Sequence, residues 1–149
     1  MDRIITYSAA APAVNRRLVY FDVLRRVRDE TLRLVVIDHE PFVAVEWRPA
    51  AGGSWRRKSL ILRDSPRGKS YWFLQVQSLC GTKKKKIALH RLVWLLANDR
   101  VAVPAEFDIH HIDQDTWNCR PENLELLPQS VNRFNRTSFG YGANSEVDF

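Results

Sequence analysis

The chain has 149 residues and a formal net charge of +6, from 23 lysine and arginine residues against 17 aspartate and glutamate residues. Hydrophobic residues make up 45% of the sequence, which excludes a wholly disordered chain because enough apolar surface can be buried. No apolar run approaches the ~20 residues of a membrane-spanning helix, and the two cysteines form no Cys-x-x-Cys pair. We therefore expect a cytoplasmic protein with one domain, or with one domain and a small extension.

The first half of the chain predicts one helix followed by strands. Apolar residues at helical spacing among arginines predict an amphipathic helix over residues 15–29. Two runs rich in β-branched residues, 31–37 and 41–47, predict a β-hairpin around a polar turn. A Pro- and Gly-rich loop at 48–54 leads to a predicted strand at 55–63 and a turn at 64–70. We interpret residues 1–66 as a small β-rich N-terminal extension with a structural or DNA-binding role.

The second half predicts another hairpin, a short helix and one compact motif. Residues 70–79 and 84–89 are the predicted strands, and residues 90–99 form the helix, at whose start we interpret His90 as structural. An extended run ending in two histidines then leads through a polar loop to a strand at 124–127 and to a helix opened by Pro128. The predicted fold is α+β, with a second domain at 67–149 whose core covers about 106–136.

Charge is distributed unevenly along the chain. Residues 48–91 contain twelve basic residues and one acidic residue, a net +11, whereas residues 101–149 carry a net −5. A basic segment beside an acidic one is typical of a phosphate-binding surface next to a cation site. A solvated hairpin is the alternative interpretation for the run of four lysines, and core packing is the alternative for the interleaved aromatic residues. The candidate DNA-binding residues in the basic segment are Arg56, Arg57, Lys58, Lys83, Lys84, Lys85 and Lys86.

The block at residues 108–135 combines groups suited to proton transfer and metal binding. Its strand, loop, strand and helix fold back on each other and bring together His110, His111, Asn123 and Asn132. A neutral imidazole accepts a proton near pH 7, and a divalent cation polarises a phosphoryl oxygen. One histidine can therefore act as a base while the other binds a metal ion. Two incidental loop histidines are the alternative, which the ordered spacing of the other residues disfavours.

This block resembles the HNH (His-Asn-His) endonucleases of the ββα-metal type, especially the phage and intron-associated homing group. The segment at 86–99 also resembles the part that this family places before its motif, so the resemblance covers about residues 70–136. It implies a C-terminal ββα-metal motif preceded by a β-hairpin and a short helix. The matching residues are His110-His111-Ile112-Asp113, the run from Asn118 to Leu124, and Ser130-Val131-Asn132.

The resemblance implies a role for each matched residue. His111 matches the general base that takes a proton from the attacking water, and Asn123 matches the asparagine that holds the histidine-bearing segment in place. His110 and Asn132 match the ligands of one divalent metal ion, and Arg133 is a further candidate for a phosphate contact. His110 replaces the aspartate that is usual in this group, and imidazole favours transition metals. We therefore expect activity with Mn²⁺ or Ni²⁺ at least equal to that with Mg²⁺.

The resemblance also implies a function, a metal-dependent DNA endonuclease that leaves 5′-phosphate and 3′-hydroxyl ends. Double-stranded DNA is the expected partner, no membrane is expected, and both a nicking monomer and a homodimer that cuts two strands remain open. A DNA-binding protein that keeps the HNH scaffold without cleaving is one alternative, and an RNA-directed nuclease is another. The expected location is the cytoplasm of a bacterium or a phage-infected host cell, with a homing-like role among several that use this fold.

Overall fold

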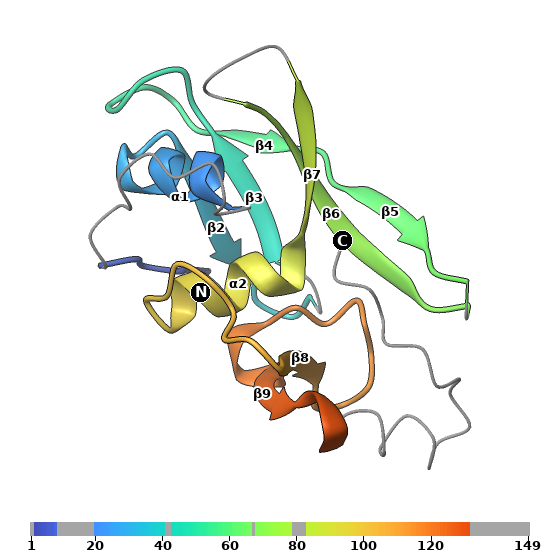
Figure 1. Ribbon diagram of the computed structural model, residues 1–149. Helices are drawn as coiled ribbons and strands as arrows, with labels where there is room; N and C mark the ends of the chain where they lie inside the picture. The colour runs from blue at the N-terminus through green and yellow to red at the C-terminus, as the bar shows by residue number, and fades with distance from the viewer. Residues whose placement is uncertain (1, 9–19, 41–42, 67, 79–82, 132–149) are drawn as a thin grey trace.

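The computed structural model describes residues 2–8, 20–40, 43–66, 68–78 and 83–131. These residues form three antiparallel sheets with a few helical segments packed against them (Figure 1). The predicted mixture of helices and strands is thereby confirmed. None of the described helices is long and apolar enough to cross a membrane.

The first sheet has four strands in the order β1-β2-β3-β4. The predicted hairpin is confirmed, because β2 and β3 pair with Leu34 opposite Val45, and both of these side chains are fully buried. Helix α1 packs against β2, and the part of its predicted range before residue 20 lies outside the described residues. The elements are β1 (Arg3–Ile4), α1 (Phe21–Arg28), β2 (Leu32–Val36), β3 (Val43–Trp47) and β4 (Arg56–Lys58).

The prediction of one continuous strand at 55–63 is wrong. The structure divides this run into β4, which pairs with β3, and β5 (Ile61–Asp64), which pairs with β6 (Ser70–Gln77). Leu60, between the two strands, packs against the main hydrophobic core. The chain therefore passes from one sheet to the next at this point, a change that a period-two pattern does not reveal.

The second sheet has the order β5-β6-β7 and carries the second helix at its end. Strand β7 (Lys84–Ala88) runs directly into α2 (Leu89–Ala97), close to the predicted helix at 90–99. The helix forms here because its apolar residues recur at helical spacing and are buried, with Leu92, Leu95 and Leu96 fully enclosed. It contacts strands β6 and β7 on one side and β8 and β9 on the other, so it joins the second sheet to the third.

The third sheet is a two-stranded ribbon of β8 (Phe107–His111) and β9 (Leu124–Pro128), linked by a loop that ends in the 3-10 turn η1 (Pro121–Asn123). Pro128 ends β9 opposite Phe107, a strand-end position that needs no backbone N–H, and a helix begins directly after it rather than at it. The described residues are helical from 129 to 131. The rest of that predicted helix lies outside the described residues.

One hydrophobic core connects the three sheets. It combines side chains such as Ile5 and Leu34 from the first sheet, Leu74 and Leu92 from the middle of the chain, and Leu124 from β9. Both predicted domains, 1–66 and 67–149, therefore contribute to the same buried cluster. The division into two domains stays a prediction.

Candidate active site

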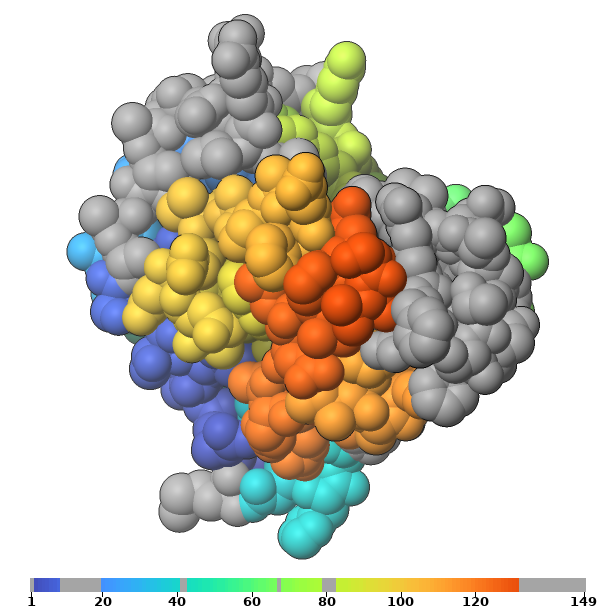
Figure 2. Space-filling view, turned by 60° about the horizontal axis from the view of Figure 1, so that its bottom comes forward, coloured from blue at the N-terminus to red at the C-terminus, as the bar shows by residue number. Residues whose placement is uncertain are grey.

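The HNH-like block occupies one face of the molecule, where β8, its loop and β9 lie side by side (Figure 2). Antiparallel pairing sets His110 opposite Glu125 and His111 opposite Leu124. The register places the end of β8, with both histidines, next to the start of β9, where the loop returns. The chain segment that carries the histidines is therefore held by backbone hydrogen bonds from a second strand.

Asn123 organises the loop between the two strands. Its side-chain Oδ1 accepts a hydrogen bond from the Asp113 backbone N–H at 3.0 Å, and its backbone carbonyl accepts one from the Ile112 N–H at 2.8 Å. Its Nδ2 donates to the Asp113 carboxylate at 2.9 Å and to the Asn118 carbonyl at 2.8 Å. Asn123 is almost fully buried, so these bonds fix the residues that directly follow His111.

The acidic residues of the loop are used to shape the loop itself. The Asp113 carboxylate accepts hydrogen bonds from the Asp115 N–H and from Asn118 Nδ2, each at 2.8 Å. The Asp115 carboxylate accepts one from the Trp117 N–H at 3.0 Å. Cys119 is a buried free thiol whose pKa is raised by burial to about 12, so it is structural.

His111 lies in a cluster of three rings from three different elements. Tyr71 comes from β6, His90 from the first turn of α2 and His111 from β8. The ring centre of His111 lies 5.0 Å from that of His90 and 6.2 Å from that of Tyr71, and the other two ring centres are 5.6 Å apart. All three side chains are nearly inaccessible to solvent. The cluster therefore packs tightly around the His111 imidazole.

The His111 imidazole is neutral and has a ring nitrogen without a partner. Burial lowers its pKa to about 4, and the nearby His110 adds to this effect. Its Nε2 is buried with no hydrogen-bond partner among the described residues. An unsatisfied buried nitrogen is uncommon and is often explained by a functional role. This imidazole is in the protonation state that can accept a proton.

His110 faces away from the ring cluster. Adjacent residues of a strand point to opposite faces, and His110 is only partly buried, whereas His111 is enclosed. Of the two predicted metal ligands, only His110 belongs to the described residues, because Asn132 lies beyond them. The described part of the chain contains no group of three or more His, Cys, Asp or Glu side chains that could hold a metal ion. The accessible His110 imidazole suits one ligand position, and the complete site stays a prediction.

Arg120 ties the loop to the N-terminal half of the chain. Its guanidinium donates hydrogen bonds to two backbone carbonyls in the β2–β3 turn, those of Glu40 at 2.8 Å and of Ile37. The turn appears as cyan atoms at the lower edge of the orange and red face in Figure 2. The N-terminal extension therefore supports the HNH-like block directly.

The candidate DNA-binding residues come from two sheets and are not equivalent. Lys84 and Lys86 on β7 are exposed, whereas Lys85 forms an ion pair of 3.0 Å with Asp22 of α1. On β4, Arg56 and Arg57 are exposed and Lys58 is partly buried. Lys83 is exposed next to β7, and Arg133 lies outside the described residues. Their contact with DNA stays a prediction.

The sequence pattern does not connect Tyr71 and His90 to the site. Tyr71 is one of several aromatic residues in a predicted strand, and His90 is expected to be structural. Both lie at least 20 positions before His111, so no local spacing connects them to it. The only available signal was a histidine at the start of the helix that precedes the motif.

A mixed α/β fold that holds a neutral, buried histidine beside a loop organised by a buried asparagine is the arrangement expected for the His-Asn part of an HNH nuclease. Comparison with protein families agrees, because residues 88–133 match the model of the HNH endonuclease family. The match begins at the last residue of β7 and includes α2, β8 and β9. No curated protein and no solved structure matches the chain.

Residues 88–133 therefore form an HNH endonuclease segment, and the predicted family resemblance is confirmed. The family match suggests nuclease activity in general and implies a nucleic-acid substrate. HNH nucleases as a family use a divalent metal ion. The likeness to the phage and intron homing group stays a prediction.

Proposed function

We propose that this protein is a metal-dependent DNA endonuclease in which His111 is the general base. The observation that supports this role most directly is that His111 is held as a neutral imidazole inside the HNH segment, with Asn123 fixing the loop that directly follows it. Hydrolysis of a phosphodiester needs a group that removes a proton from the attacking water. A neutral imidazole inside the HNH segment meets that need.

In the proposed reaction, His111 takes one proton from a water molecule while the water oxygen forms a bond to phosphorus. The bond from phosphorus to the 3′-oxygen breaks, which leaves a 5′-phosphate and, after protonation, a 3′-hydroxyl. A pKa of about 4 makes His111 a weak base in the free protein. The negative charge of bound DNA near the ring would raise this pKa and strengthen the base.

The surrounding residues keep the base in position. Asn123 fixes the loop directly after His111 through its bonds to Asp113 and Asn118. Tyr71 and His90 pack against the imidazole and limit its rotation. This support matters because a misplaced base loses rate steeply with distance.

The proposed metal ligands are His110 and Asn132. Residues 129–131 are helical directly after β9. By resemblance to the HNH family, we propose that this helix continues to Asn132 and completes a ββα arrangement with β8 and β9. A divalent ion held there would polarise the phosphoryl oxygen and neutralise charge on the leaving oxygen. Both ligands are neutral and one is an imidazole, so we expect Mn²⁺ or Ni²⁺ to support activity at least as well as Mg²⁺.

The proposed substrate is double-stranded DNA, bound by basic residues of β4 and β7 and by Arg133. Exposed lysines and arginines contact phosphates without reading sequence, which suits a nuclease that must hold a duplex. By resemblance we extend the proposal to a nicking, homing-like role in the cytoplasm of a bacterium or a phage-infected cell.

A supercoiled-plasmid assay tests this function. The wild-type protein should convert the plasmid to a nicked or linear form with Mn²⁺, Ni²⁺ or Mg²⁺ and not with EDTA. His111→Ala should lower the rate by about a hundredfold or more, because the base is lost, while DNA affinity stays unchanged. His39→Ala is the matched control, since His39 is exposed in the β2–β3 turn.

Two results would contradict the proposal. If the wild type binds DNA but never cleaves it with any of the three metals, the protein is a binding module on an HNH scaffold. If His111→Ala cleaves as fast as the His39→Ala control, His111 is not the base. An RNA substrate in parallel distinguishes a DNA nuclease from an RNA-directed one, and ligation of the products reports the 5′-phosphate.

A further inference from the structure

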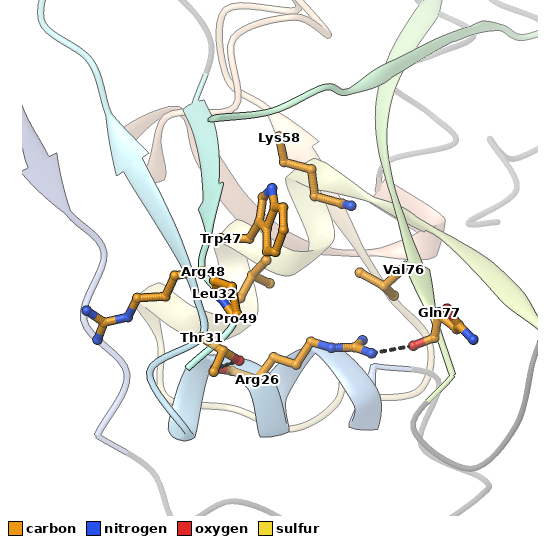
Figure 3. Close-up of a pocket in the computed structure, with 9 residues that line it drawn as sticks. All are labelled: Arg26, Thr31, Leu32, Trp47, Arg48, Pro49, Lys58, Val76 and Gln77. Carbon is orange, nitrogen blue, oxygen red and sulfur yellow. Dashed lines mark hydrogen bonds between the residues drawn. The ribbon is translucent and has the colours of Figure 1, made fainter. Parts of the chain in front are cut away.

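A second candidate site lies in the N-terminal half of the molecule, away from the HNH segment. It is a cleft of about 280 Å³ between the first sheet, α1 and β6, which we call the Trp47 cleft (Figure 3). None of the residues that line it belongs to residues 88–133. Its inner surface includes the buried side chains of Leu32 and Val76. In Figure 3 the indole of Trp47, the ammonium of Lys58, Val76 and the guanidinium of Arg26 surround one open space.

The Trp47 cleft is electropositive. Arg26 is held at one side by a hydrogen bond of 2.6 Å from its Nη2 to the Gln77 carbonyl, while its Nη1 has no hydrogen-bond partner among the described residues. Burial lowers the pKa of Lys58, and the positive charges of Arg26 and Lys84 lower it further. No aspartate or glutamate is among the described residues that line the cleft. A bound anion would relieve the repulsion between these three cations.

The same cleft presents an aromatic face. Trp47 is 37% exposed, and its indole forms one wall next to Lys58 (Figure 3). An indole beside cations suits a ligand that combines a flat ring with a negative group, because the ring stacks while the charge is neutralised. Inorganic phosphate alone would leave the indole without a contact. The volume is near the lower end of the range for ligand pockets, about 300 to 1,000 Å³, so it suits a single small ligand.

We propose that the Trp47 cleft binds one unpaired nucleotide, with the base against Trp47 and the phosphate against Arg26 and Lys58. The nucleotide can come from two sources, a free nucleoside monophosphate or an unpaired position in a DNA strand. The stacked base pairs of an intact duplex do not offer a free ring face to Trp47. This site does not depend on the proposed nuclease function, because none of its lining residues belongs to the HNH segment, although Lys58 is also a candidate DNA contact.

Binding is measured by calorimetry on the full chain in EDTA, so that no DNA is cleaved. The probes are deoxyadenosine monophosphate, deoxyadenosine, inorganic phosphate and a single-stranded hexamer of deoxyadenosine. The test variants are Trp47→Leu, which removes the ring, and Lys58→Gln, which removes the charge. Arg63→Gln is the matched control, because Arg63 is exposed on β5 and does not line the cleft.

The monophosphate should bind about tenfold more tightly than either deoxyadenosine or phosphate, because only it uses both the ring and the cations. Trp47→Leu and Lys58→Gln should each weaken its binding about fivefold, whereas Arg63→Gln should change it by less than about twofold. Trp47→Phe keeps a ring and should retain most of the affinity. Circular-dichroism melting curves establish that each variant is folded.

The binding results distinguish a free nucleoside monophosphate from an unpaired nucleotide in a DNA strand. Competition between the hexamer and the monophosphate indicates an unpaired nucleotide in a strand, and binding of the monophosphate without competition indicates a free nucleotide. The proposal is overturned if phosphate binds as tightly as the monophosphate, or if Arg63→Gln weakens binding as much as Lys58→Gln. Plasmid cleavage plays no part in this test, so its result is independent of the nuclease assay.

Discussion

His90 and His111 are the two histidines that the fold removes from solvent. Their rings lie 5.0 Å apart between β6, α2 and β8, with the Tyr71 ring against both. Burial lowers the pKa of each below its ordinary value, and for His90 the neighbouring His111 and Arg91 add to the effect. Two neutral imidazoles in contact avoid the repulsion that two protonated ones would suffer. The pair therefore remains neutral in the folded protein at neutral pH.

These lowered pKa values predict a loss of stability in mild acid. The unfolded chain takes up protons on both histidines near pH 6.5, whereas the folded chain does so only at lower pH, so acidification favours unfolding. We expect the urea midpoint of the full chain in EDTA to fall between pH 7.5 and pH 5.0. Replacing His90 with Asn should reduce the size of this fall, because one of the two titrating groups is removed. A midpoint that is the same at both pH values would show that the histidines are not buried in neutral form.

The four consecutive lysines from Lys83 to Lys86 have different environments, because three of them belong to strand β7. In the sequence they form one basic cluster, but side chains of a strand alternate between two faces. Lys85 therefore turns toward α1 and pairs with Asp22, whose side chain is only 6% exposed, while Lys84 and Lys86 stay in solvent. A lysine that already pairs with a carboxylate gains less from contact with a phosphate, because it must give up the existing ion pair.

The salt dependence of DNA binding tests this difference. Each phosphate contact contributes about 0.9 to the slope of log affinity against log salt on duplex DNA. We expect the double variant Lys84→Gln, Lys86→Gln to reduce the slope by up to about 2, and Lys85→Gln to leave it nearly unchanged. Lys85→Gln should instead lower the melting temperature, because the largely buried Asp22 loses its ion pair. An equal loss of slope in both variants would refute the distinction.

Local sequence patterns predict where the helices and strands lie, but they do not predict which strands pair with each other. The hairpin of β2 and β3 was predictable, because β-branched runs around a polar turn need only neighbouring residues. The division of 55–63 into β4 and β5 was not, because Leu60 packs against a core formed by distant residues. Pro128 is typical of a helix start, and a helix does begin directly after it, but pairing with Phe107 makes Pro128 itself the last residue of β9.

The three sheets share the main hydrophobic core and are joined by polar contacts. Ile5 and Leu34 from the first sheet lie in the same buried cluster as Leu92 of α2 and Leu124 of β9. Arg120 adds hydrogen bonds from the HNH loop to the β2–β3 turn, and Arg3 pairs with Glu122 at 3.0 Å. The HNH segment is therefore stabilised by residues that lie outside it.

This shared core predicts that the two halves do not fold independently. A fragment of residues 67–149 would expose the side chains that now pack against the first sheet, and it would lose the Arg120 contacts. We expect this fragment to show no cooperative thermal transition by circular dichroism, whereas the full chain should show one. As a control, a separate fragment of residues 1–66 is added to the 67–149 fragment, and the mixture should regain the cooperative transition. Cooperative melting of 67–149 alone would instead support two autonomous domains.

The sequence by itself determined the family, the two hairpins and the spacing of the motif residues from His110 to Asn123, because these depend on residues that are near neighbours in the chain. The proposed chemistry of the site rests on those same residues. Tertiary structure alone decided that Tyr71 and His90 enclose His111, that Lys85 pairs with Asp22 and that Trp47 shares a cleft with Arg26. These contacts join elements far apart in the chain, and the packing of a common core, which no local pattern records, brings them together.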